Sequence, residues 1–280
     1  MSKRKYSPIG VFDSGIGGLT VVKRVAAALP NESIIYFGDT ARVPYGPKSN
    51  NTVIEYGLEA ASFLIDKKVK AIVVACNTVS SVAIPEIRKH FNVPVIEMIE
   101  PGVNAAIRAS ASKRIGVIGT LATINNAAYS KSILNKLPDA FVIEKACPLF
   151  VPLVEEGWIE HKVTELIAQE YLAALIEKEI DTLILGCTHY PVLTNVIKKI
   201  VGDKVTLVDS GVAAADTVRS ELNRMGMETN SNGMGMIEFY VSDLPTTFSK
   251  VAQIFLEKEI REVIRVDLEV IQRLKEKIVG

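Results

Sequence analysis

Short apolar runs recur along the chain, and most are followed by a longer stretch with helical spacing. The runs are continuously apolar rather than alternating, which is typical of parallel strands that are covered on both faces. We therefore predict strands at Ile9–Phe12, Ser33–Phe37, Lys70–Ala75, Val93–Ile96, Arg114–Gly119, Thr182–Leu185, Lys204–Val208 and Ile237–Val241.

The intervening stretches carry apolar residues at the spacing of one helix face. They predict helices at Leu19–Leu29, Thr52–Lys67, Val82–His90 and Val212–Asn223, with a short charged helix at the end of the chain. Alternation of strands and helices indicates an α/β fold with right-handed crossovers. No flexible linker composition separates the elements, so we expect compact domains joined by close crossings.

A weak internal repeat divides the chain into two similar units. Ile9–Val11 reappears as Ile115–Val117, and each opens a predicted strand that ends in a turn of small residues. Later in each unit a strongly apolar strand ends in a cysteine, Cys76 in the first and Cys187 in the second. Ligands of open α/β sheets bind at the carboxyl ends of the strands. Two such units face to face place the two thiols across a cleft.

The composition of the chain argues against several classes of binding partner. The 280 residues include 32 basic and 32 acidic side chains, and this balance gives no electrostatic footprint for nucleic acid or an anionic membrane. No apolar run has the length of a signal peptide or a membrane span, so we expect a cytoplasmic protein. Three cysteines without a CxxC spacing predict free thiols, and Cys147, which lacks polar neighbours in the sequence, is predicted to lie in the core.

The segment Asp13–Gly18 follows the first strand and opens a helix. Its glycines allow a tight turn whose amides can bind an anion such as a small carboxylate. A dinucleotide site is the alternative, with Asp39 at the end of the second strand as the ribose ligand. That motif requires glycine at the position of Thr20, and Asp13 would crowd a pyrophosphate, so we favour the carboxylate.

Cys76 and Cys187 are the strongest candidates for chemistry. Each precedes hydroxyl or amide side chains and a helix start, where the pKa of a thiol falls and thiolate becomes available. A buried apolar role is the usual one for a single cysteine, but two matched contexts favour reactive thiols. Zinc is the other chemistry that cysteine and histidine support. Cys187 and His189 are separated by one residue, which does not match common zinc ligand spacings, and we expect no metal.

Two further segments offer polar groups to the same cleft. The loop Gly38–Gly46 is rich in glycine and proline, and Arg42 with the amides around Tyr45 and Gly46 can hold a carboxylate. Glu155 and Glu156 follow an apolar loop at 151–154, so one of them can point into the cleft.

At these residues the chain resembles a known family. The strings FDSGIGGLTV, GDTARVPYG, ACNTVSS, IGVIGT, ACPLFVPLVEEG and LGCTHYP are similar, in order and spacing, to those of the bacterial glutamate racemases. The resemblance runs from about Ile9 to Thr217 and is looser over the last 50 residues. It implies two similar α/β domains, each a mostly parallel sheet flanked by helices, with the active site in the cleft between them.

The resemblance also implies an activity. The implied activity is the cofactor-independent interconversion of L- and D-glutamate, which supplies D-glutamate for peptidoglycan. Cys76 would take the α-proton from D-glutamate and Cys187 from L-glutamate, with Asp13 assisting Cys76. Glu155 and His189 would assist Cys187.

By the same resemblance, several residues from both domains would line the substrate. They are Asp13, Ser14, Tyr45, Gly46, Asn77, Thr78, Thr120, Thr188 and His189. The first domain would comprise residues 1–98 and 210–280, and the second residues 99–209. Glutamate is the expected small-molecule partner, and the family resemblance implies a homodimer.

The residues themselves support the implied chemistry. Inversion of a stereocentre by proton transfer needs a base on one face and an acid on the other, and two facing thiols supply that pair. An aspartate racemase remains an alternative, since one methylene in a pocket changes binding by only about 1–3 kcal/mol. A two-domain carboxylate-binding protein is another alternative, although it would need neither cysteine.

Overall fold

The structure is a computed structural model that describes residues 4–244, 248–258, 260 and 262–279. Two sheets, each made of parallel strands, form its framework. The six-stranded first sheet has the order β10-β9-β2-β1-β3-β4, and the four-stranded second sheet has the order β6-β5-β7-β8. The strands are β1 (Ile9–Asp13), β2 (Ile34–Gly38), β3 (Ala71–Val74), β4 (Val95–Ile96), β5 (Arg114–Gly119), β6 (Phe141–Ala146), β7 (Thr182–Gly186), β8 (Thr206–Asp209), β9 (Ile237–Val241) and β10 (Ile264–Arg265).

Helices cover both faces of each sheet, so the strands are apolar on both sides. The α-helices are α1 (Leu19–Ala28), α2 (Asn50–Asp66), α3 (Asn77–Ser80), α4 (Ile84–His90), α5 (Ile99–Ala109), α6 (Leu121–Asn125), α7 (Ala128–Lys136), α8 (Phe150–Glu155), α9 (Lys162–Glu177), α10 (Thr194–Val201), α11 (Ser210–Arg224), α12 (Phe248–Leu256) and α13 (Leu268–Val279). Two 3-10 helices, η1 (Arg4–Tyr6) and η2 (Tyr190–Leu193), complete the described elements.

Alternate residues of the first sheet enter different cores. On β1, Val11 packs with α1, α11 and α12, while Phe12 packs with α2, α4 and α13. The second sheet is divided in the same way. On β5, Val117 packs with α5 and α7, while Ile118 joins the core beneath α9 and α10. Successive residues of one strand point to opposite faces, and both faces are buried. The strand sequences are therefore continuously apolar, as expected for parallel strands covered on both sides.

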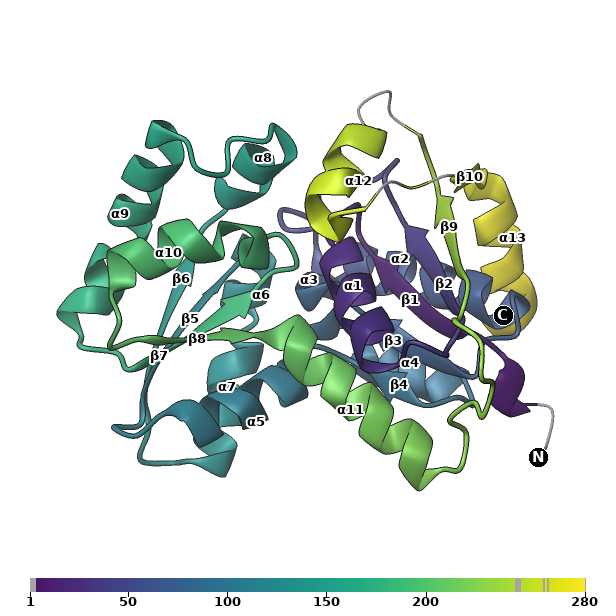
Figure 1. Ribbon diagram of the computed structural model, residues 1–280, viewed down its shortest axis with the longest axis horizontal. Coiled ribbons are helices and arrows are strands. Elements are labelled where there is room, and N and C mark those ends of the chain that lie inside the picture. The colour runs from purple at the N-terminus through teal and green to yellow at the C-terminus, as the bar shows by residue number, and fades with distance from the viewer. Residues whose placement is uncertain (1–3, 245–247, 259, 261, 280) are drawn as a thin grey trace.

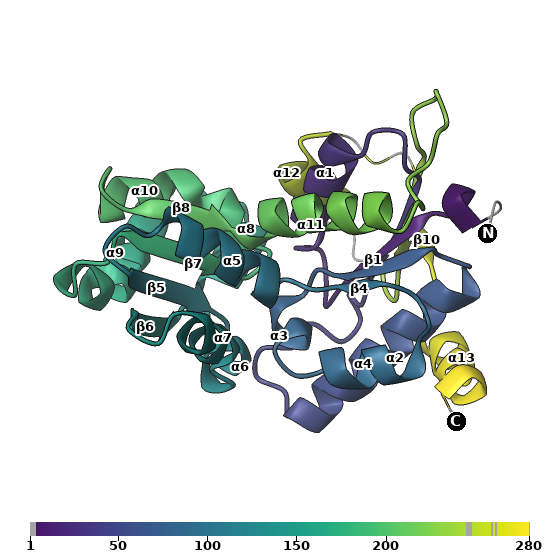
Figure 2. The same ribbon diagram turned by 90° about the horizontal axis from the view of Figure 1, so that it is seen from below.

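The elements gather into two lobes, one built on each sheet (Figure 1). We call the lobe of the first sheet the first lobe and that of the second sheet the second lobe. The chain passes from the first to the second near the start of α5 and returns along α11, which packs against both α1 and α5. Figure 2 shows α11 starting at the junction and running across the first lobe, and both chain ends belong to the first lobe (Figures 1 and 2).

The predicted α/β fold with two similar halves is confirmed. The structure adds β6 and β10, which the apolar pattern did not predict, because their residues are half-buried or exposed. The segment at 151–154, interpreted as an apolar loop, is in fact part of α8. Among the described residues, no helix combines the length and apolarity that crossing a membrane requires.

Candidate active site

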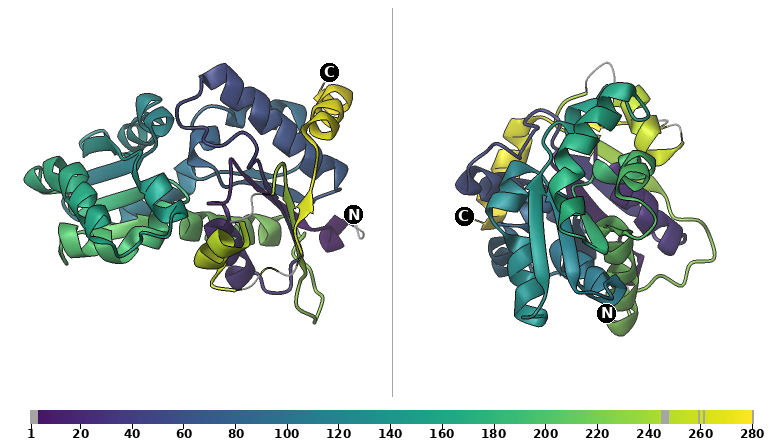
Figure 3. Two further views of the ribbon diagram at one scale, coloured as in Figure 1. Left: turned by 90° about the horizontal axis from the view of Figure 1, so that it is seen from above. Right: turned by 90° about the vertical axis from the view of Figure 1, so that its left-hand side faces the viewer.

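A small enclosed cavity of about 30 Å³ lies between the lobes, at the carboxyl ends of strands from both sheets. The left view in Figure 3 shows the two lobes side by side, and in the right view the second lobe lies in front of the first. Both candidate thiols line the cavity, as do most of the residues implied by the family resemblance. The lining consists of Ser14, Val43, Pro44, Tyr45, Gly46, Cys76, Asn77, Thr78, Thr120, Val151, Cys187, Thr188 and His189.

Cys76 stands between β3 and α3, on the first-lobe side of the cavity. It occupies the position before the first turn of α3, and its sulfur lies 3.5 Å from the Ser14 hydroxyl. Burial and the neighbouring Asp13 carboxylate raise the pKa of the Cys76 thiol to about 12. Burial therefore outweighs the helix start, contrary to the lowered pKa expected from the sequence. At this pKa Cys76 is a thiol, which can donate a proton.

Asp13 ends β1 and is almost fully buried. Its Oδ2 accepts hydrogen bonds from the backbone N–H groups of Gly15 (3.2 Å) and Gly18 (3.0 Å). Its Oδ1 is buried and has no hydrogen-bond partner among the described residues. Burial raises the pKa of Asp13 in spite of the opposing positive field of His189. The turn predicted to bind an external anion thus binds its own carboxylate, and one oxygen is left to accept a proton or a hydrogen bond.

Cys187 stands at the end of β7, on the second-lobe side, and begins a relay of polar groups. Its sulfur lies 3.9 Å from Nδ1 of His189, whose Nε2 lies 2.9 Å from Oε1 of Glu155. Burial alone would lower the pKa of His189, but the hydrogen bonds with Cys187 and Glu155 raise it to about 10. An imidazolium held between a sulfur and a carboxylate can pass a proton to or from Cys187.

The glycine turn of the first lobe packs directly on this relay. A Cβ placed on Gly17 would lie 2.4 Å from Oγ1 of Thr188 and 2.5 Å from Nδ1 of His189. The next turn adds a hydrogen bond, since the Thr20 hydroxyl lies 2.9 Å from the backbone oxygens of both Gly17 and Thr188. The absence of a side chain at Gly17 therefore permits close contact between the lobes, and the hydrogen bond from Thr20 to Thr188 stabilises that contact.

Hydroxyl and amide groups also bridge the lobes on the Cys76 side. The Thr78 hydroxyl lies 2.9 Å from that of Thr120, which caps α6 by accepting a bond from the Thr123 amide. The phenol of Tyr129 donates to Oδ1 of Asn77 at 2.6 Å. Nδ2 of Asn77 is buried without a partner among the described groups, so a donor is available to a bound molecule.

Arg42 does not face the cavity, and the expectation that it holds a carboxylate ligand is wrong. Its Nε donates to Oδ2 of Asp39 at 2.7 Å, and its Nη1 donates to Oε2 of Glu59. Two carboxylates of the same lobe pair with Nε and Nη1, and the buried Nη2 has no partner among the described residues. Asp39 is fully buried in this cluster and is not free to bind a ribose, which argues against the dinucleotide alternative.

Most of the other residues expected in the site line the cavity or contact a residue that does. Ser14, Tyr45, Gly46 and Thr188 line the cavity, whereas Glu155 reaches it through His189. Glu156 is exposed. Cys147 is buried and its pKa is raised by burial, in agreement with its predicted core position.

The sequence reasoning missed several residues that shape the cavity. Val43, Pro44 and Val151 form apolar parts of its wall, and the ring of Phe255 stands edge-on to His189 with centroids 5.3 Å apart. Val43 and Pro44 lie inside a loop that was singled out, but nothing local marks them as wall residues. Phe255 comes from α12, in the part of the chain where the family resemblance is loose.

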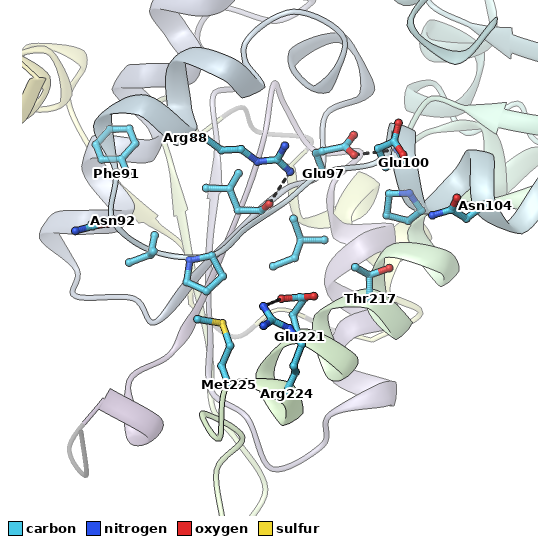
Figure 4. A pocket seen from close by; sticks show the side chains of 15 residues that line it. Arg88, Phe91, Asn92, Glu97, Glu100, Asn104, Thr217, Glu221, Arg224 and Met225 are labelled. Atoms are coloured by element: carbon cyan, nitrogen blue, oxygen red, sulfur yellow. Dashed lines mark hydrogen bonds and ion pairs between the residues drawn. The ribbon is translucent and has the colours of Figure 1, made fainter. Parts of the chain in front are cut away.

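A larger cavity of about 570 Å³ lies away from both candidate thiols, between α4, β4, α5 and α11 (Figure 4). Its charged groups are largely engaged with the protein itself. Arg88 donates to the backbone oxygen of Val95 at 3.1 Å, and Arg224 pairs with Glu221 at 2.7 Å. No cysteine or histidine is among its described lining residues, so it lacks the paired thiols of the smaller cavity.

The geometry is suited to moving a proton across a carbon atom held between the lobes. Each lobe contributes one sulfur, and each sulfur has its own acid or base nearby. Hydroxyls, an amide and backbone groups line the space, and groups of this kind bind carboxylate oxygens, although the cavity of about 30 Å³ has room for little more than a water molecule. Within the described ranges, no group of three or more His, Cys, Asp or Glu side chains is arranged to hold a metal ion.

Comparison with known proteins agrees with this geometry. Residues 9–218 match the family model described as Asp/Glu/Hydantoin racemase. The chain is 47% identical over 264 residues to the glutamate racemase of Geobacter metallireducens, which spans 94% of this chain and 98% of the relative. It is 49% identical over 258 residues to the glutamate racemase of Chlorobaculum tepidum, covering 92% and 95% of the two chains.

Solved structures share the fold as well. The glutamate racemase of Francisella tularensis, determined in complex with D-glutamate, superposes with a TM-score of 0.89 at 42% identity. The superposition covers 95% of this chain and 99% of that protein. The resemblance thus extends past residue 217, where the sequence motifs end.

Proposed function

Because the chain belongs to the Asp/Glu/hydantoin racemase family and is therefore an isomerase, we propose that it interconverts L- and D-glutamate by two-thiol proton transfer. The observation that carries the proposal is the pair of cysteines, one from each lobe, lining one cavity. The glutamate racemase relatives and the D-glutamate complex of the Francisella tularensis protein support glutamate as the substrate.

In the L-to-D direction, Cys187 as thiolate removes the α-proton of L-glutamate. The electron pair of the broken C–H bond is delocalised into the α-carboxylate, and the α-carbon becomes planar. Cys76 then donates its thiol proton to the opposite face, which completes D-glutamate and leaves Cys76 as thiolate. The D-to-L direction reverses these steps, so each sulfur is base in one direction and acid in the other.

The groups beside the sulfurs act as proton helpers. The raised pKa of Cys76, caused by burial and by Asp13, opposes the thiolate form. An incoming α-ammonium group favours thiolate by its positive charge, and the unpaired Oδ1 of Asp13 can take the proton. His189, held by Glu155, exchanges a proton with Cys187 on the other side.

Substrate contacts are proposed on both sides of the cavity. The free Nδ2 of Asn77 and the hydroxyls of Thr78, Thr120 and Thr188 are placed to donate to carboxylate oxygens. Donors of this kind stabilise the negative charge that develops on the α-carboxylate as the proton leaves. Ser14, Asp13 and His189, with the Tyr45–Gly46 loop, complete the proposed binding set.

Several further properties belong to the same proposal. The enzyme works without a cofactor, since the two thiols and their helpers supply both acid and base. Its domains are residues 1–98 with 210–280, and residues 99–209. It acts in the cytoplasm as a homodimer and supplies D-glutamate to peptidoglycan synthesis.

The deciding experiment is incubation of the purified protein with L-glutamate in D₂O without added cofactor. We expect loss of optical rotation to zero, with deuterium incorporated at the α-carbon of both enantiomers. Parallel incubation with L-aspartate separates the two substrates. Turnover of aspartate alone would replace glutamate in the proposal, and no turnover of either acid would overturn it.

A further inference from the structure

The loop between β2 and α2 belongs to a buried polar cluster that the proposed proton transfers do not use. We call it the Asp39 cluster, and it consists of Asp39, Arg42, Glu59, Ser242 and the phenol of Tyr45. Burying charged and polar groups costs free energy, and hydrogen bonds within the cluster offset that cost. Its place beside the cavity raises the question of what it holds.

Asp39 is the centre of the cluster. Its Oδ1 accepts from the Ser242 hydroxyl at 2.7 Å, and its Oδ2 accepts from Nε of Arg42 at 2.7 Å and from the Tyr45 hydroxyl. Its backbone N–H donates to the backbone oxygen of Asp13 at 3.1 Å. Asp39 therefore connects its own loop with the residue that follows β9 and, through its backbone, with Asp13 at the end of β1.

Arg42 anchors the cluster to the surrounding fold. Its Nη1 donates to Glu59, which lies within α2. Its guanidinium carbon lies 3.8 Å from the ring centre of Tyr56, also on α2. Through Arg42, Asp39 is connected to α2 as well as to the sheet, so its position is fixed by several elements of the first lobe.

Tyr45 connects the cluster to the cavity. Its hydroxyl binds Asp39, while its side chain lines the cavity opposite the second lobe. The adjoining Gly46 accepts a bond from the Ala122 amide at 3.2 Å, and a Cβ there would lie 3.2 Å from Cβ of Thr120. The Pro44–Gly46 segment is therefore held on one side by Asp39 and on the other by α6.

We propose that Asp39 is a positioning residue, which holds Tyr45 and Gly46 at the cavity wall, where they contact the substrate. The inference rests on the proposed function, because it assigns a cause to the placement of two substrate-lining residues. Burial and the charge of Asp39 raise the pKa of Tyr45, so its phenol stays protonated and remains a donor to Asp39. Without this bond the segment samples more conformations, and substrate must order it on binding.

The test compares Asp39→Asn and Tyr45→Phe with the wild-type protein. Both variants keep the size of the side chain. Asp39→Asn leaves one acceptor oxygen for the three donors that Asp39 binds, and Tyr45→Phe removes the phenol hydroxyl. We expect KM for both glutamate enantiomers to rise about fivefold to tenfold, with kcat changed less than about threefold. In the double variant the two KM effects should not multiply, because each removes the same contact.

Asp181→Asn is the matched control. Asp181 accepts from the Ser110 hydroxyl and the Ser112 amide at 2.6 Å each, but it lies at the amino end of β7, opposite the cavity. We expect this variant to lower Tm without raising KM. If Asp39→Asn and Tyr45→Phe also lower Tm while KM stays unchanged, Asp39 is merely structural and the inference fails.

Hydrogen exchange gives a readout that does not depend on turnover. The Lys48 amide donates to the backbone oxygen of Tyr45 at 3.0 Å, so its exchange reports on the segment. We expect faster exchange around Lys48 in Asp39→Asn and no change in Asp181→Asn. Unchanged exchange in both would overturn the inference. A wild-type protein that is inactive on glutamate would instead count against the proposed function, whatever the exchange result.

Discussion

Gly17 of the first lobe and His189 of the second are in such close contact that no Cβ fits between them. An ideal Cβ on Gly17 would lie 2.5 Å from Nδ1 of His189, the nitrogen that faces Cys187. The contact places the glycine turn of the first lobe against the proton helper of Cys187, which the second lobe holds through Cys187 and Glu155.

Gly17→Ala should therefore damage catalysis more than stability. The methyl group must displace His189 or Thr188, and a shift of about 1 Å in a catalytic group can cost about 100-fold in rate. We expect kcat/KM for glutamate to fall at least about tenfold, measured by circular dichroism. Gly233→Ala is the control, because its Cβ meets only the Ser231 hydroxyl at 3.8 Å. Equal activity of the two variants would contradict the contact.

Removal of either thiol should stop racemisation and leave one-sided exchange. In Cys76→Ala, Cys187 can still remove and return the α-proton of L-glutamate, so deuterium enters L-glutamate without inversion. Cys187→Ala should show the same behaviour with D-glutamate. We expect racemisation to fall by about 1000-fold or more in both, followed by NMR in D₂O. Cys147→Ala, a change in the core, should keep its activity, and exchange of the opposite enantiomer would reverse the assignment.

Asp13→Asn should make Cys76 more reactive and the enzyme slower. The Asp13 carboxylate raises the pKa of Cys76 in addition to burial, so its neutralisation lowers that pKa. We expect faster alkylation of Cys76 by iodoacetamide at pH 8, quantified on its peptide by mass spectrometry. Racemisation should fall at the same time, because the proton acceptor is lost. Slower alkylation would show that Asp13 activates the thiol directly.

His189 links folding stability to pH. Its pKa in the folded protein is raised from 6.5 to about 10, since its bonds with Cys187 and Glu155 outweigh the lowering by burial. The stabilisation is present in full below pH 6.5 and is lost as the pH rises through about 10. Compared with His189→Gln, wild type should lose stability over this window by at most about 1.4 kcal/mol per pH unit. Urea denaturation at several pH values tests this, and a constant difference would contradict it.

A buried ion pair at the opposite edge of the first sheet affects stability alone. Lys70 is fully buried, pairs with Glu32 and donates to the backbone oxygens of Lys5 and Met227. Lys70→Met leaves Glu32 buried without a counter-charge, which should lower the free energy of unfolding by about 3–5 kcal/mol. KM for glutamate should not change at temperatures where the variant is folded. A raised KM would indicate that the pair acts on the distant site.

The parts of the site that could be predicted are those carried by single strands. Cys76 and Cys187 each end an apolar run, and the carboxyl ends of parallel strands share one edge of a sheet. The two cysteines belong to different sheets, so the pattern predicts only that each lies at the carboxyl edge of its own sheet. The roles assigned to Asp13, Glu155 and His189 came from the family resemblance, and they stay predictions.

The parts that could not be predicted depend on contacts between distant segments. Thr20 departs from a dinucleotide motif in the sequence, but in the fold its hydroxyl meets the backbone of Thr188. The position of Arg42 in a loop at the carboxyl edge of the sheet predicts a contact with a ligand carboxylate. Its partner Glu59 lies on the following helix, and nothing in the local pattern indicates that the two side chains meet.

The order of strands in the first sheet has a consequence for synthesis on the ribosome. All four strands of the second sheet lie between residues 114 and 209, so that sheet can be completed as soon as they emerge. The first sheet begins earlier but pairs β2 with β9, and its edge at β2 stays open until Val241 has been made. The nascent chain therefore carries an unpaired strand edge through most of translation, when such edges are prone to wrong pairing.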